Sequence, residues 1–275
     1  MSLSDPSARA LAPRLSFLEL FSDAVRLAAS RWALLIKVGL ILLVLTVVRW
    51  LLFGDVQQLP DEAAADFVAT EPRHWLLLLV EIPFYSVAAV ACHRLFLVGP
   101  GEVQGLKAYS FNGRVLRFFG YLALITMLFT LLGGMSAVFG VILLTLIPGL
   151  GLLPAPILAL LTLVIMLPAG AVMASWSLLL PAVALEHPHR GLKGAFEMAE
   201  GHRWTLTLAV FVTPTLPMFV LPWLPIWHFT GADMVMGFLS LVFAVIALAM
   251  LSLAYARLHG FQPEAESQQA CNALG

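Results

Sequence analysis

The residues best suited to chemistry lie in the most polar stretch of the chain, residues 184–204. The glutamates and histidines of this stretch are Glu186, His187, His189, Glu197, Glu200 and His202. Imidazole and carboxylate groups are good ligands for zinc and similar ions. However, Pro188 favours an extended backbone at His187, which would point the rings of His187 and His189 apart. A metal or catalytic site would need both histidines and a glutamate to converge, so we favour a polar corner between two helices.

A second candidate site lies inside a hydrophobic segment. Glu81 follows Trp75 by six residues, so it would lie about 9 Å into a helix that spans a membrane. A lone carboxylate at this depth is costly, and such residues are often functional. Arg49 is near the same end of the preceding hydrophobic segment, so an Arg49–Glu81 ion pair would satisfy both side chains. Tyr85 lies one turn deeper, and the same residues would also suit an ion or proton site.

The composition of the chain indicates that both candidate sites belong to a membrane protein. Of its 275 residues, 61% are hydrophobic and only 11% are charged, far from the balance of a soluble domain. A helix needs about 20 mainly apolar residues to cross a bilayer. Six segments meet this length, at residues 33–53, 75–97, 118–147, 156–185, 204–226 and 233–258. We therefore expect an all-α fold with six transmembrane helices.

The distribution of lysine and arginine predicts the orientation of these helices. With the N-terminus inside, 13 of the 15 basic residues fall on the inner side, and only Arg49 and Arg73 fall on the outer side. An excess of basic residues marks the cytoplasmic side of a membrane. The sequence thus predicts a multi-pass protein of the bacterial inner membrane with both termini in the cytoplasm.

Two segments outside the spans have the pattern of amphipathic helices. In residues 15–32 and 191–201, apolar side chains recur at helical spacing and charged side chains take the other positions. We expect both segments to lie in the cytoplasmic interface of the membrane. Arg31, Arg117 and Arg203 each precede an aromatic residue and are 86 residues apart, a spacing that fits either a threefold repeat or coincidence.

Four short motifs resemble a known group of membrane proteins. The motifs are LLLPAVALE (178–186), GLKGAFEMAEGHRW (191–204), HRLFLVG (93–99) and RVLRFFGYL (114–122). They are similar to those of uncharacterised six-helix bacterial inner-membrane proteins, which are akin to the membrane domain of some glycerophosphodiester phosphodiesterases. The resemblance implies a six-span bundle with an interfacial helix between spans four and five. The resemblance implies no activity, since the phosphodiesterase's catalytic barrel has no counterpart in the sequence. The pattern of the group also has no histidine at the positions of His187 and His189.

The expected organisation has three parts. A cytoplasmic segment with an amphipathic helix occupies residues 1–31, a six-helix transmembrane domain residues 32–258, and a disordered cytoplasmic tail residues 259–275. We expect a non-enzymatic bundle that interacts with membrane lipids, with a membrane-protein partner or with a second copy of itself. A net charge of −1 gives no reason to expect nucleic acid, and the sequence predicts neither a cofactor nor a bound metal.

The main alternative is a transporter of small solutes or ions. Glu81 would be its intramembrane site, and a fifth span broken by prolines would line its pathway. These prolines are Pro214, Pro217, Pro222 and Pro225. Broken helices are typical of transporters, although proline is also common in transmembrane helices generally. The transporter hypothesis predicts a polar cavity at mid-depth, whereas an enzyme would need His187, His189 and a glutamate to meet.

Overall fold

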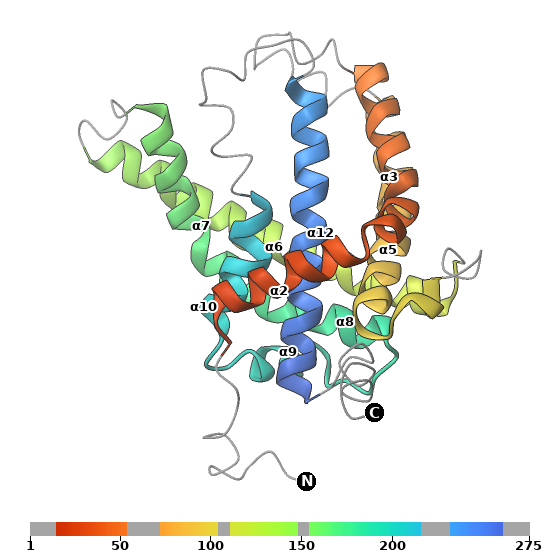
Figure 1. Ribbon diagram of the computed structural model, residues 1–275. Coiled ribbons are helices and arrows are strands. Elements are labelled where there is room, and N and C mark those ends of the chain that lie inside the picture. Colours follow the sequence, from red (N-terminus) through yellow and green to blue (C-terminus); the bar gives the residue numbers. More distant parts are fainter. Residues whose placement is uncertain (1–14, 54–71, 104–110, 148–153, 216–231, 261–275) are drawn as a thin grey trace, which may run out of the picture.

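The described part of the chain is helical and contains no strand, in agreement with the expected all-α class (Figure 1). Helices are the natural form of such apolar segments, because each backbone N–H and C=O finds its partner within the same segment. The computed structural model describes residues 15–53, 72–103, 111–147, 154–215 and 232–260. The expected N-terminal segment before residue 15, the outer loop at 54–71 and the tail after residue 260 lie outside these ranges.

The described helices follow one another in chain order. They are α2 (Phe17–Ser30), α3 (Trp32–Phe53), α5 (Pro72–Leu97), η2 (Pro100–Val103), α6 (Gly113–Leu146), α7 (Ala155–Ser177), α8 (Leu179–Ala184), α9 (Gly191–Met198), α10 (Arg203–Leu206), η5 (Thr207–Val212) and α12 (Ala232–His259). The η2 segment is a single 3-10 turn, whereas η5 has π-helical hydrogen bonding.

Four of the described helical segments are long and apolar enough to cross a membrane. They are Leu79–Leu97, Gly113–Leu143, Leu160–Ala184 and Val235–His259. The expected first span lies in α3, which bends by 50° between its two apolar pieces and makes a fifth candidate when both pieces are counted together. The expected fifth span is described only as far as residue 215, so its later prolines fall outside the described residues.

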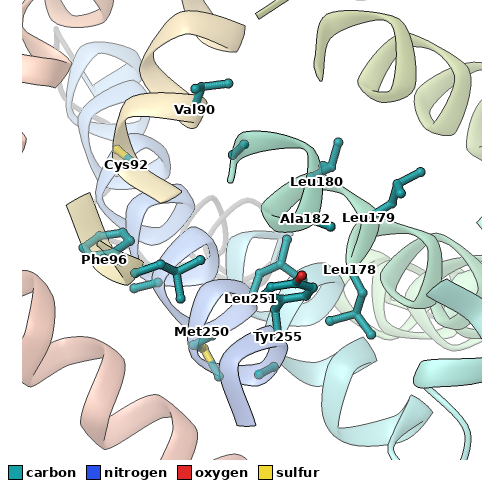
Figure 2. Close-up of a cluster of buried hydrophobic side chains, with 14 of the residues drawn as sticks. Val90, Cys92, Phe96, Leu178, Leu179, Leu180, Ala182, Met250, Leu251 and Tyr255 are labelled. Atoms are coloured by element: carbon teal, nitrogen blue, oxygen red, sulfur yellow. The ribbon is translucent and has the colours of Figure 1, made fainter. Parts of the chain in front are cut away.

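The hydrophobic core is concentrated at one end of the bundle, where α5 and α12 end and α8 lies against them (Figure 2). All six side chains of α8 are buried. The largest fully buried side chains of this region include Phe96, Leu178, Leu179, Met250 and Tyr255. We call this region the α8 end of the bundle. The dense packing of this region fixes the positions of the helices that carry the surrounding polar groups.

Helix α2 crosses α12 and packs against it (Figure 1). Its buried face contains Leu20 and Ala24, one turn apart, which explains the helical spacing of apolar residues in this segment. Asp23 of α2 forms an ion pair with Arg257 near the end of α12. At the start of α2, the backbone oxygen of Leu15 accepts a hydrogen bond from Thr205 Oγ1 of α10, at 3.1 Å. These contacts attach α2 to two helices that come much later in the sequence.

Small residues allow the later helices to approach closely. A Cβ added to Gly170 of α7 would lie 2.5 Å from the ring of Phe211, which belongs to η5. The ring of Phe211 also contacts Phe129 of α6, with centroids 5.7 Å apart. Gly140 of α6 faces the side chain of Ile165 at ordinary contact distance. The small residues at these two positions therefore serve packing within the chain.

Candidate functional site

The polar corner expected at residues 184–204 begins with an unusual backbone turn at the end of α8. The N–H of Glu186 bonds to the oxygen of Val183, and the N–H of His187 bonds to the oxygen of Ala182. This pair of bonds closes the helix in a Schellman motif. Glu186 has a φ of 59° and is the single non-glycine residue with a positive φ in the described ranges. Glycine normally occupies this position, so the backbone of Glu186 is strained.

The start of α6 supplies two arginines that bind the Glu186 carboxylate. The side chain of Asn112 accepts hydrogen bonds from the N–H groups of Arg114 and Val115 and so caps the helix. Arg114 and Arg117 are three residues apart and share one face of α6. Arg114 Nη2 donates to Glu186 Oε2 at 2.7 Å, and Arg117 Nη2 donates to Glu186 Oε1 at 3.2 Å. Each carboxylate oxygen therefore accepts a hydrogen bond from a different guanidinium group.

A third arginine approaches from α5. Arg94 Nη1 donates to the oxygen of Ala184, the last residue of α8, at 3.3 Å. The pKa of the Glu186 carboxyl lies below its ordinary value, chiefly because of the hydrogen bond from Arg114 and also because of the positive charges of Arg114, Arg117 and Arg94. We call Arg94, Arg114 and Arg117 the arginine cluster. It lies where three apolar helical segments meet at the α8 end of the bundle.

The two histidines that flank Pro188 point to different helices. His187 Nδ1 lies 3.0 Å from the hydroxyl of Tyr255, and its ring is 5.7 Å from that of His259 on α12. His189 instead meets the ring of Tyr121 on α6 edge-on, with centroids 5.4 Å apart. Burial lowers the pKa of His187, and the nearby His259 lowers it further, so the neutral form is favoured.

The remaining polar residues of the stretch lie on or after α9. Glu197 is 3.9 Å from Lys193, one turn earlier, and both are largely exposed. Glu200 is exposed in the turn after α9, and burial lowers the pKa of the half-buried His202. Among the described residues, no three histidines, cysteines, aspartates or glutamates lie close enough together to hold a metal ion.

The structure brings Arg49 and Glu81 together. Arg49 Nη1 donates to Glu81 Oε2 at 3.2 Å, which joins α3 to α5. Glu81 is only 3% exposed, whereas the side chain of Arg49 is 42% exposed. Tyr85 lies one turn further along α5 and is partly exposed. A cavity of about 500 Å³ lies elsewhere, between α6 and α7. Its lining is apolar apart from Ser136, whose hydroxyl donates to the oxygen of Leu132.

One buried polar contact was not expected from the sequence. His93 of α5 is fully buried, and its Nδ1 lies 2.8 Å from Ser252 Oγ of α12. The Ser252 hydroxyl donates to the oxygen of Leu248, so it accepts from His93 Nδ1. A histidine within an apolar run was the available signal for this contact. The arginine cluster was also missed as a site, although the spacing of Arg114 and Arg117 at a helix start indicates a shared face.

No protein-family model, curated protein or solved structure matches the chain. The function is therefore inferred from the arginine cluster, from Glu186 and from the apolar helices that position them.

Proposed function

We propose that the chain is an integral protein of the bacterial inner membrane that binds anionic lipid headgroups without catalysing a reaction. Six spans with both termini in the cytoplasm place α2 and α9 at the cytoplasmic interface. The observation that carries the proposal is the meeting of Arg114 and Arg117 at one carboxylate beside Arg94. A basic site between helices on the cytoplasmic side is the usual means of binding a charged headgroup.

The position of the arginine cluster supports a lipid as the ligand. Arg94 lies in the last turn of α5, and Arg114 and Arg117 lie in the first turn and a half of α6. The ends of spanning helices lie at the depth of the lipid phosphates. Along α6, Leu116 and Met127 are exposed on one face and provide an apolar surface for acyl chains. A lipid bound in this way would satisfy the arginines and cover part of α6.

The same geometry gives less support to a transporter. The bond from Arg49 accounts for the buried Glu81 as part of a structural pair, and the cavity between α6 and α7 is apolar. The lipid proposal instead uses charged groups that lie at the α8 end, where a headgroup has access to them.

Binding of short-chain lipids to the purified protein in a neutral detergent tests the proposal. Arg114→Gln and Arg117→Gln are each expected to weaken the binding of an anionic lipid about fivefold, since one basic residue contributes about 1 kcal/mol at a membrane surface. The matched control is Lys193→Gln, which removes one positive charge from an exposed position on α9. This control should bind the lipid as the wild type does.

A zwitterionic lipid such as phosphatidylcholine should bind equally weakly to all four proteins. If the two arginine variants bind anionic lipid as tightly as Lys193→Gln does, the arginine cluster is not a headgroup site and the proposed function is wrong.

A further inference from the structure

Glu186 occupies the place that a headgroup would take between Arg114 and Arg117. We infer that Glu186 is an internal competitor, which a phosphomonoester headgroup displaces from these two arginines when it binds. The inference rests on the proposed function and specifies the ligand class of the same site. In this role, Glu186 prevents weaker anions from binding to the two arginines.

The contacts of Glu186 are suited to displacement. Its side chain is 45% exposed, that of Arg117 is 62% exposed and that of Arg114 is 21% exposed. Ion pairs between exposed groups contribute little stability because water solvates both partners. A stronger anion can therefore replace the carboxylate without breaking the apolar packing of α8.

One donor of Arg114 points to an anion with more oxygens than a carboxylate. Its Nη2 binds Glu186, whereas its Nε is buried and has no hydrogen-bond partner among the described residues. In a guanidinium group, Nε–H and one Nη2–H point in the same direction and together bind phosphate or carboxylate in a bidentate manner. Glu186 divides its oxygens between two arginines and cannot do this. A phosphate can accept both bonds from Arg114 and a further bond from Arg117.

The charge of the ligand decides which phosphate can compete. A carboxylate and a phosphodiester each carry one negative charge, so the exchange of one for the other gains no charge. A phosphomonoester carries about −1.5 to −2 at pH 7 and offers three strong acceptor oxygens. Phosphatidic acid has such a headgroup, whereas phosphatidylglycerol is a phosphodiester. Arg94 adds to the positive potential at the site and favours the more highly charged ligand.

The experiment measures the affinities of purified protein in neutral detergent for dioctanoyl phosphatidic acid and dioctanoyl phosphatidylglycerol. The wild type is expected to bind phosphatidic acid about tenfold more tightly, because of the additional charge-assisted hydrogen bonds. Glu186→Gln should strengthen the binding of both lipids by a common factor of roughly three to ten, since neither lipid then displaces a charged competitor. Phosphatidic acid remains the preferred ligand of this variant.

Glu197→Gln is the matched control, because it removes one carboxylate charge from an exposed position on α9. It should leave both affinities unchanged. Glu186→Gly is a second variant whose residue type suits the positive φ, and it should strengthen binding as Glu186→Gln does. If both substitutions at position 186 weaken binding or leave it unchanged, Glu186 organises the site or takes no part in it, and the inference is wrong.

Two further arms separate the possible failures. If Arg114→Gln/Arg117→Gln abolishes lipid binding while the Glu186 variants fail to strengthen it, only the competitor role is lost and the proposed function stands. If the double arginine variant binds both lipids as the wild type does, the proposed function fails as well.

Binding of glycerol 3-phosphate shows whether the ligand is a lipid headgroup or a soluble phosphomonoester. Much weaker binding than that of phosphatidic acid supports a lipid headgroup, whereas equal binding overturns it in favour of a soluble phosphomonoester.

Discussion

Glu81 and Glu186 are both carboxylates bound by arginine, but their surroundings give them different roles. Glu81 is almost completely buried and binds Arg49 across two helices. Removing one partner of a buried pair is expensive, because the remaining charge is poorly solvated. Glu186 is exposed and shares two arginines, so its bonds are easily exchanged. At the scale of single residues, burial therefore distinguishes an ion pair that is costly to break from one that a ligand can exchange.

Arg49→Leu is expected to lower the free energy of unfolding by roughly 3 kcal/mol, because it removes a charged donor from the buried Glu81. The double variant Arg49→Leu/Glu81→Leu should recover most of this loss, since two apolar side chains fill a similar space without a charge. Thermal and denaturant unfolding in detergent provide the measurement. Arg26→Leu, on the exposed face of α2, is the control and should change stability by less than about 0.5 kcal/mol. A double variant no more stable than Arg49→Leu would contradict this account.

The two pairs also differ in how far the sequence reveals them. Arg49 and Glu81 lie at similar distances from the same end of consecutive antiparallel segments, so depth alone predicts their meeting. Glu186 lies 72 residues from Arg114, and their meeting depends on how α6 packs against α8. No local pattern encodes that packing. The sequence did predict from Pro188 that the rings of His187 and His189 would point apart, and the two contact different helices. It gave no sign of the positive φ at Glu186.

At the scale of elements, the segment η5 combines an irregular helix with a tight contact. Pro214 has no N–H group and disturbs the hydrogen bonds of the preceding turn, where the π-helical segment lies. Thr213 Oγ1 donates to the backbone oxygen of Leu208 at 2.8 Å, so this oxygen of the widened turn has a hydrogen-bond partner. The sequence predicted that proline would disturb this span. It did not predict that the disturbed turn would press Phe211 against Gly170, because that contact depends on the position of α7.

Gly170→Ala is expected to destabilise the protein by about 1–3 kcal/mol, because the new methyl group overlaps the ring of Phe211. Gly134→Ala is the matched control, since an added Cβ meets nothing within 4 Å among the described residues. Alanine favours the helix over glycine, so the control should be neutral or stabilising by up to about 1 kcal/mol. Unfolding midpoints in detergent compare the two variants. Equal midpoints would show that Phe211 moves aside at no cost.

At the scale of the whole molecule, the all-helical class follows from composition alone, whereas the number of spans needs the positions of the helix ends. Four helical segments are long and apolar enough to cross a membrane, and the bent α3 is a fifth candidate. The sequence identified α3 as apolar but gave no sign of its bend. Hydropathy reports the length of an apolar segment, and a bend depends on the neighbours of that segment.

Six spans predict that residues 54–71 and the C-terminus lie on opposite sides of the membrane. Single cysteines introduced into each region, in a chain with Cys92 and Cys271 replaced, can be labelled with a reagent that does not cross membranes. In intact cells without an outer membrane, only the cysteine in the 54–71 region should react, because the distribution of basic residues predicts that the termini lie in the cytoplasm. Labelling of both positions, or of the C-terminus alone, would contradict the topology.

The attachment of α2 to α12 sets an order of assembly. Asp23 and Arg257 are 234 residues apart in the chain, so α2 is synthesised long before its partner exists. At a ribosomal rate of about 5–20 residues per second, the delay is roughly 10–50 s. During that time, the apolar face with Leu20 and Ala24 must be covered by something other than α12. We therefore expect the newly made α2 to lie on the lipid surface during this time and to dock once α12 has been inserted.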